Sequence, residues 1–225
     1  MPFQDRIDAG RQLAAKLIHY AGRRDVVVLA LPRGGVPVAY EVAKELRAAL
    51  DVFLVRKLGW PPQPELAMGA IAQGGVRVLH DDVVDELDVP ESVIDRVADE
   101  EARELVRQQE LYRPGRAPPD VAGRTVILID DGLATGSTMR AAVAALRAKR
   151  PERLVVAVPV GAPQTCGEFQ ELVDEVVCAA RPEEFRAVGM WYRDFSPTSD
   201  EQVLQLLAEA SQWAAAPSPV THQSA

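Results

Sequence analysis

The chain has 225 residues, of which 48% are hydrophobic and 26% charged, a composition typical of a globular protein with a buried core. This length predicts one domain, or two small ones. The net charge of −8 argues against a nucleic-acid backbone as the main partner. Neither a membrane span nor a secretory signal is apparent in the sequence, so we expect a cytoplasmic protein.

The first half of the chain predicts alternating helices and buried strands. Apolar residues at helical spacing predict a helix over 5–20, and another is expected from about 36 to 49. Continuous apolar runs at 26–31 and 51–55 predict fully buried strands. Residues 57–75 are rich in glycine and proline with little periodicity, which predicts a long irregular loop with a small hairpin at its far end.

The second half continues the alternation and predicts a parallel sheet. Cys166 and Cys178 are not at metal-binding spacing, so we expect them to be small apolar fillers. Strands alternating with helices form right-handed βαβ units, which predicts an α/β fold with a central, mainly parallel sheet flanked by helices. The predicted elements are helices over 90–112, 139–146, 168–172 and 200–213, and strands over 126–129, 154–160 and 176–180.

The most informative stretch runs from Val126 to Thr138. Asp130 and Asp131 follow four apolar residues, and a small Thr/Gly/Ser loop then opens into a helix. Unpaired N–H groups at a helix start favour a phosphate, and Gly136 permits its close approach. The carboxylates would repel that phosphate and instead need donors, such as a sugar diol, a metal or water. The stretch therefore predicts a sugar-phosphate site.

Three alternatives compete with this interpretation. A nucleotide hydrolase needs a GxxxxGK[ST] loop upstream, and the sequence contains none. A phospho-accepting receiver domain carries its acidic pair near the N-terminus and a further acid after a later strand, whereas the next strand here ends in Val160 and Gly161. Simple helix capping accounts for Asp130 alone, but not for two carboxylates before a Thr/Gly/Ser/Thr run.

Residues Val126 to Thr138 resemble the phosphoribosyl-pyrophosphate (PRPP) motif of the type I phosphoribosyltransferases. Gly132 departs from that motif, because an aliphatic residue is commoner there. The resemblance implies a type I phosphoribosyltransferase-like fold in a single domain over 1–213. The Ala, Pro and Ser content of residues 214–225 predicts a disordered tail. It further implies a core at about 22–160, a flexible flap at about 57–75, and a small hood from about 1–20 and 181–199.

The resemblance also implies binding roles for three groups of residues. Asp130 and Asp131 would hold the ribose 2′ and 3′ hydroxyls. The 5′-phosphate would bind to the loop of Ala134, Thr135, Gly136, Ser137 and Thr138. Pyrophosphate would bind to Pro32, Arg33, Gly34 and Gly35, a loop that often contains a cis non-proline peptide in this family.

Further residues are implied in catalysis and in acceptor binding. Arg56 and Lys57 would neutralise the leaving pyrophosphate, and Glu65 in the flap is a candidate for proton transfer. The hood aromatics could stack on a planar acceptor or simply pack the last helix onto the sheet; they are Trp191, Tyr192 and Phe195.

The implied activity is transfer of the phosphoribosyl group of PRPP to a nitrogen nucleophile, with a nucleobase as first candidate, in nucleotide salvage. Ala134 argues against a 6-oxopurine acceptor, because enzymes for those bases carry an aspartate at this place. Mg²⁺ would be held mainly by PRPP and not directly by the protein. The expected partners are PRPP, a small acceptor and further copies of the chain in a homodimer or larger assembly, without nucleic acid or membrane.

Two other functions stay open from the sequence. A PRPP- or nucleotide-sensing regulator would keep the fold with little or no turnover, although the net charge and the lack of a helix-turn-helix extension count against it. A hydrolase could act on a ribosyl phosphate in the same pocket. A flap that excludes water favours transfer over hydrolysis.

Overall fold

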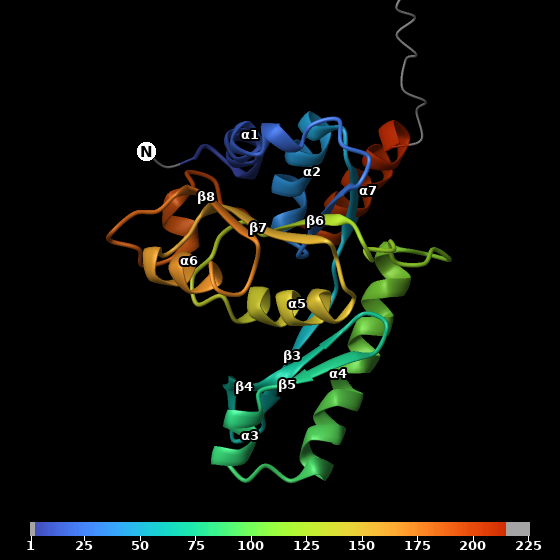
Figure 1. Ribbon diagram of the computed structural model, residues 1–225, viewed down its shortest axis with the longest axis vertical. Helices are drawn as coiled ribbons and strands as arrows, with labels where there is room; N and C mark the ends of the chain where they lie inside the picture. Colours follow the sequence, from blue (N-terminus) through green and yellow to red (C-terminus); the bar gives the residue numbers. More distant parts are fainter. Residues whose placement is uncertain (1–2, 215–225) are drawn as a thin grey trace, which may run out of the picture.

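The computed structural model describes residues 3–214, which form a large and a small β-sheet with helices packed around them (Figure 1). The tail expected over 214–225 lies outside the described residues, except that Ala214 ends the last helix. In chain order the elements are α1 (Arg6–Lys16), η1 (Ile18–Tyr20), β1 (Val26–Ala30), α2 (Gly35–Leu46), β2 (Ala49–Val52), β3 (Val55–Trp60), β4 (Gln63–Ala72), β5 (Val76–Leu79), α3 (Asp81–Glu86), α4 (Glu91–Tyr112), β6 (Thr125–Ile129), α5 (Ser137–Ala148), β7 (Arg153–Val160), α6 (Pro163–Phe169), β8 (Glu175–Ala180), η2 (Val188–Trp191) and α7 (Asp200–Ala214).

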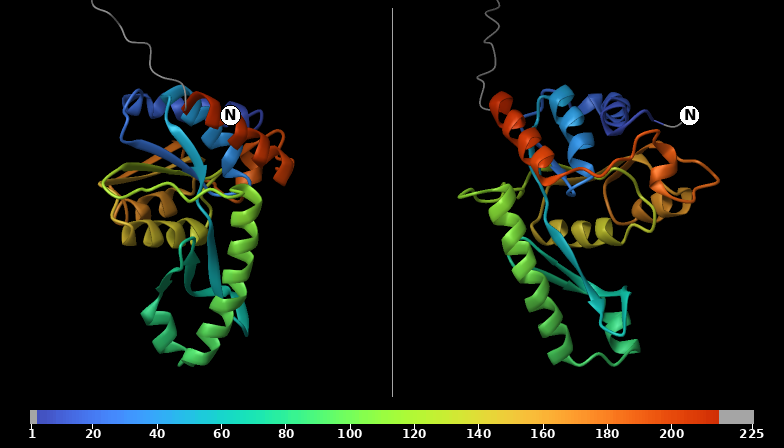
Figure 2. Two further views of the ribbon diagram at one scale, coloured as in Figure 1. Left: turned by 90° about the vertical axis from the view of Figure 1, so that its right-hand side faces the viewer. Right: turned by 180° about the vertical axis from the view of Figure 1, so that it is seen from behind.

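The large sheet confirms the predicted α/β fold. Its five strands run in the order β2-β1-β6-β7-β8, and every neighbouring pair is parallel. Helices α1, α2 and α7 cover one face, and α5 and α6 cover the other (Figures 1 and 2). All residues of β1 and β6 are buried, as their continuous apolar runs predict. Because these strands are parallel neighbours, the loops after them meet at one edge of the sheet.

The prediction of an irregular loop over 57–75 is wrong. Strands β3, β4 and β5 form a three-stranded antiparallel sheet that extends from the main body together with α3 and α4 (Figure 1). The hairpin at the far end is confirmed, with Gly74 and Gly75 at φ values of 83° and 75°. Gly69 lies inside β4, where a Cβ would approach the carbonyl oxygen of Val78 in the neighbouring strand to 2.3 Å. Such a glycine permits close strand pairing, which explains why the composition misled the prediction.

Smaller differences concern the ends of helices. Helix α6 begins at Pro163, five residues before the expected start, and α3 was not expected at all. Helix α2 ends at Leu46, and Arg47 follows in the left-handed conformation at a φ of 54°. Among the residues that the structure describes, no helix is both long and apolar enough to cross a membrane.

Arg113 fastens the end of α4 to the large sheet. Its side chain is fully buried, and its Nε donates to Asp51 Oδ1 at 2.8 Å. The guanidinium also donates to Gln73 Oε1 at 2.7 Å and to the backbone oxygen of Val52. Asp51 and Val52 belong to β2, while Gln73 follows β4. A single buried cation therefore joins α4, the large sheet and the small sheet.

We predict that Arg113→Met lowers the free energy of unfolding by about 3–5 kcal/mol, because it leaves Asp51 without its buried partner. Urea unfolding followed by circular dichroism measures the change. Arg107 on α4 pairs with Glu104 at 2.7 Å with 61% of its side chain exposed, and therefore serves as the control. Arg107→Met should leave the free energy of unfolding nearly unchanged. Equal losses in the two variants would contradict the fastening role.

Candidate functional site

The candidate site is built around two carboxylates at the end of β6. Asp130 and Asp131 directly follow this buried strand, and Asp130 Oδ1 accepts a hydrogen bond from the Asp131 backbone N–H at 2.8 Å. Burial, followed by the neighbouring Asp131 charge, raises the pKa of Asp130 well above its ordinary value. Burial also raises the pKa of Asp131, and Arg6 opposes that shift. The pair is therefore an electrostatically costly arrangement of acceptors.

Arg6 of α1 is the main partner of Asp131, and the sequence analysis missed it. Its Nε and Nη2 both donate to Asp131 Oδ2, at 3.0 and 2.7 Å, while Nη1 donates to the Ser196 carbonyl at 2.8 Å. The guanidinium carbon also lies 4.0 Å from the ring centroid of Phe195. Arg6 therefore joins the N-terminal helix, the sugar motif and the C-terminal segment.

The loop predicted to hold a phosphate ends at the N-terminus of α5. Gly136 is the N-cap with a φ of 74°, and a Cβ there would lie 2.7 Å from the Phe169 ring. Glycine is therefore required at this position. No side chain caps the helix, so its first N–H groups remain available to an anion. Thr165 fixes the loop by donating from Oγ1 to the Ala134 carbonyl at 2.7 Å.

The other residues of this loop face solvent. Ala134, Thr135, Ser137 and Thr138 are exposed, and the Thr135 and Ser137 hydroxyl oxygens lie 3.4 Å apart. Hydroxyls and free backbone N–H groups thus occur together, as the prediction of a phosphate cradle requires.

The loop after β1 lies against the same carboxylates. The peptide bond between Pro32 and Arg33 is cis, as the family resemblance led us to expect. A Cβ on Gly34 would lie 2.1 Å from Asp131 Oδ2, and one on Gly35 would lie 2.8 Å from the Ile129 carbonyl. Gly34 is also the N-cap of α2, without a side-chain cap. Glycine at both positions allows this loop to contact the end of β6.

Arg56 and Lys57 contribute to a cavity of about 340 Å³ beside these loops. Pro32 and Thr138 line the same cavity, so it connects both predicted phosphate-binding loops. Arg56 Nε donates to Glu101 Oε2 of α4 at 2.6 Å, a contact that sequence reasoning missed. Glu101 engages only Nε, so this contact orients the Arg56 guanidinium at the cavity. The side chain of Glu65 lies outside the described part of the structure, and its role in proton transfer stays a prediction.

The three predicted hood aromatics are brought together, but they differ in exposure. Tyr192 is buried between Phe3 and Phe195, with ring centroids 5.5 and 5.0 Å away, and its hydroxyl donates to the Asp131 carbonyl. Trp191 and Phe195 are partly exposed. The predicted acceptor role stays a prediction for all three, whereas the packing of Tyr192 against the sugar motif is a structural fact.

Val188 explains the unusual glycine in the central motif. A Cβ on Gly132 would lie 2.4 Å from Val188 Cγ1 and 2.7 Å from Cγ2. The Val188 side chain thus occupies the space that an aliphatic residue at position 132 would fill. The departure of Gly132 from the usual motif was the only sequence signal that pointed toward this contact.

Comparison with known proteins gives one family. A sequence model described as "Phosphoribosyl transferase domain" matches residues 3–66 and 65–190. Two sequences of Mycobacterium tuberculosis, from strains CDC 1551 and H37Rv, are each 50% identical over 208 residues and bear the name "Putative phosphoribosyl transferase". The match covers 92% of this chain and 47% of each relative, so the chain spans about half their length.

A solved structure from Thermus thermophilus is similar over nearly the whole chain. It has a TM-score of 0.84 and 42% sequence identity, and the match covers 93% of this chain and 99% of that one.

We predict that Gly132→Ala destabilises the protein by about 1–3 kcal/mol, because Val188 must move. Adding Val188→Ala should recover most of the loss, since the two effects are coupled. Thermal unfolding of the single and double variants measures both. Gly167→Ala is the control, because nothing lies within 4 Å of a Cβ there. A double variant as unstable as the sum of its parts would be inconsistent with this contact.

Arg6→Gln should destabilise the protein in a pH-dependent way. Without Arg6, the folded-state pKa of Asp131 rises further above its unfolded value of about 4. Stability is then lost as pH rises from the unfolded pKa toward the folded one. We expect little loss near pH 4 and a loss of about 3 kcal/mol near pH 7.

Urea unfolding at both pH values measures this difference. Lys16→Gln on the same helix is the control, because Lys16 is exposed and forms no ion pair with a described residue. It should leave the stability nearly unchanged at either pH. An Arg6→Gln loss that does not grow with pH would argue against the pairing.

Proposed function

The chain belongs to the phosphoribosyltransferase family, and we propose that it transfers the 5-phosphoribosyl group of PRPP to a nitrogen nucleophile with release of pyrophosphate. The observation that carries this proposal is the close approach of Gly34 to Asp131. It brings a glycine loop at the start of α2 against the carboxylates that precede the phosphate loop of α5. The open first turn of α5 suits the phosphate of a phosphorylated sugar, and the 32–35 loop with Arg33 suits a diphosphate next to the carboxylates.

Each part of the chain has a defined task in this proposal. The first turn of α5 binds the 5′-phosphate through backbone N–H groups and the hydroxyls of Thr135 and Ser137. Asp130 and Asp131 accept hydrogen bonds from the ribose hydroxyls and stabilise positive charge on the ribosyl ring. Residues 32–35 hold the diphosphate while the nucleophile attacks C1′ and the bond from C1′ to the diphosphate oxygen breaks. The protein acts by positioning and electrostatics.

Mg²⁺ bound together with PRPP, as the family implies, would supply positive charge to the diphosphate. Among the described residues, no group of three His, Cys, Asp or Glu side chains could hold a metal ion. The contribution of the chain is to hold the diphosphate with the backbone of residues 32–35 and with Arg33.

The acceptor is proposed to bind on the hood side of the ribose, where Trp191 and Phe195 keep partly exposed rings. A nucleobase is the first candidate, because aromatic faces suit a planar heterocycle. Ala134 supplies no carboxylate near such a base, which disfavours a 6-oxopurine. The sheet of β3 to β5 is proposed as the flap that excludes water during transfer.

We further propose that residues 1–213 act as one domain, in the cytoplasm and as a homodimer or larger assembly. Family membership supports this, together with the shared cluster of buried residues that extends from α1 and α2 to α4 and the small sheet.

Asp130→Asn and Asp131→Asn should each weaken PRPP binding at least tenfold, because an amide accepts fewer hydrogen bonds and carries no charge. Calorimetric titration of the full chain with PRPP and Mg²⁺ measures this, with the exposed Asp99 of α4 changed to Asn as the control. Unchanged PRPP affinity in both site variants would exclude the ribose assignment.

A screen of nucleobases and small amines for PRPP-dependent pyrophosphate release identifies the acceptor. Release with one acceptor class supports transfer. Tight PRPP binding without release for any acceptor would instead favour the sensing function that the sequence left open.

A further inference from the structure

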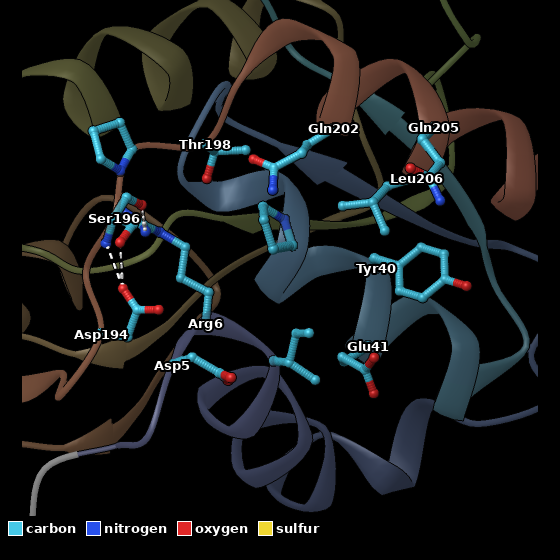
Figure 3. Close-up of a pocket in the computed structure, with 13 residues that line it drawn as sticks. Asp5, Arg6, Tyr40, Glu41, Asp194, Ser196, Thr198, Gln202, Gln205 and Leu206 are labelled. Atoms are coloured by element: carbon cyan, nitrogen blue, oxygen red, sulfur yellow. Dashed lines mark hydrogen bonds between the residues drawn. The ribbon is translucent and has the colours of Figure 1, made fainter.

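A cavity of about 370 Å³ lies between α1, α2, α7 and the segment 194–198 (Figure 3). None of the residues predicted to bind PRPP lines it. Its size is within the range of small-molecule sites. Figure 3 shows side chains from all four segments around one hollow, with Arg6 on its wall.

Arg6 separates this cavity from the candidate sugar-phosphate site. All three nitrogens of its guanidinium donate, to Asp131 and to the Ser196 carbonyl, and the ion pair with Asp131 compensates its charge. The cavity therefore lies next to the sugar motif and is not part of it. Arg6 does not add an unpaired positive charge to the cavity.

The cavity is lined by a hydroxyl that has no protein partner. Thr198 has only 7% of its surface exposed, and it lines the cavity (Figure 3). No described residue forms a hydrogen bond with its side chain, although polar groups that are largely buried are nearly always paired. Every fully enclosed polar side-chain atom among the described residues has a partner, so the Thr198 hydroxyl keeps some access to solvent. It is thus a donor and acceptor available to a molecule in the cavity.

Three carboxylates line the cavity. Each has one oxygen committed, because Asp5 accepts from the Asp8 N–H at 2.8 Å, Glu41 from Arg11 at 2.9 Å, and Asp194 from Ser196 at 2.5 and 2.9 Å. No described donor reaches the second oxygen of Asp5, Glu41 or Asp194. Arg11 offsets the charge of Glu41, so Asp5 and Asp194 give the lining its negative charge, which attracts a cation and repels an anion, while all three carboxylates keep an open acceptor.

The apolar residues of the lining favour an elongated organic cation over a compact metal ion. Ile7, Pro37 and Leu206 add apolar surface between the polar groups. No group of three acidic, His or Cys side chains in the described chain lies close enough to hold a metal ion. The carboxylates are thus spread around the hollow, and a compact metal ion could not satisfy them together.

We propose that this cavity binds a small organic cation, with amino or guanidino groups at the ends of a short apolar body, as a second site separate from the sugar-phosphate site. The free carboxylate oxygens take the charged ends, Thr198 takes one hydrogen bond, and the apolar lining takes the stem. Because Arg6 forms the shared wall, the occupant lies next to the side chain that orients Asp131.

Agmatine, with a guanidinium and an ammonium joined by four carbons, is the probe for this site. Calorimetric titration into the full chain at constant ionic strength should give saturable binding of one molecule per chain. The acid 4-guanidinobutyrate has the same guanidinium but a carboxylate for the ammonium, and it should bind at least tenfold more weakly because the cavity is acidic.

Variants then locate the binding. Glu41→Gln and Thr198→Val should each weaken agmatine binding at least fivefold, while Glu45→Gln, on the same helix but outside the cavity, should change it less than twofold. Unfolding curves recorded without agmatine show which variants fold. If either Glu41→Gln or Thr198→Val does not fold, the agmatine affinity of the other one decides the test.

Two outcomes overturn the proposal: absence of saturable binding, or equal binding in all folded variants. The titration contains no PRPP, so it is independent of whether the chain transfers a phosphoribosyl group.

Discussion

The structure depends on placing two adjacent carboxylates at the partly buried end of β6. Like charges in a poorly solvated position repel, and burial raises the pKa of both Asp130 and Asp131. The fold compensates this cost with groups from distant parts of the chain. Arg6 reaches Asp131 from the first helix, and Gly34 leaves the space that the Asp131 carboxylate and Arg6 occupy. Much of the candidate site is thus organised by the need to accommodate this charge.

The same constraint gives the site its polarity. Helices α2 and α5 both begin beside the carboxylates, and neither has a side-chain cap. The first N–H groups of α2 donate to the Leu31 and Arg33 carbonyls, so the first turn of α5 is the place for an anion, while the carboxylates are the place for hydrogen-bond donors. Gly34 and Gly136 keep these places open because a side chain at either position would clash with its neighbours. Backbone groups therefore carry much of the binding chemistry.

The sequence predicted the parts of the fold that depend on local pattern. The apolar runs at 26–31, 126–129 and 154–160 correspond to the parallel strands β1, β6 and β7, whereas the run at 51–55 is divided between the end of β2 and the start of β3. The motif from Val126 to Thr138 specifies strand, loop and helix within thirteen residues. The segment 57–75 was mispredicted because Gly69 serves close strand pairing, which cannot be distinguished from a loop glycine without the partner strand. Arg6 could not be predicted, because its partner Asp131 lies 125 positions away and no periodicity links the two.

The contact between Gly132 and Val188 makes the central motif and the hood interdependent. A hood transplanted from a relative with a small residue at position 188 would leave a void above Gly132, and a motif with an aliphatic residue at 132 would collide with the present hood. The two segments are thus not interchangeable modules. During divergence, a larger residue can replace Gly132 only after a smaller residue has replaced Val188. Earlier substitutions in the hood therefore limit which sugar motifs the chain can acquire.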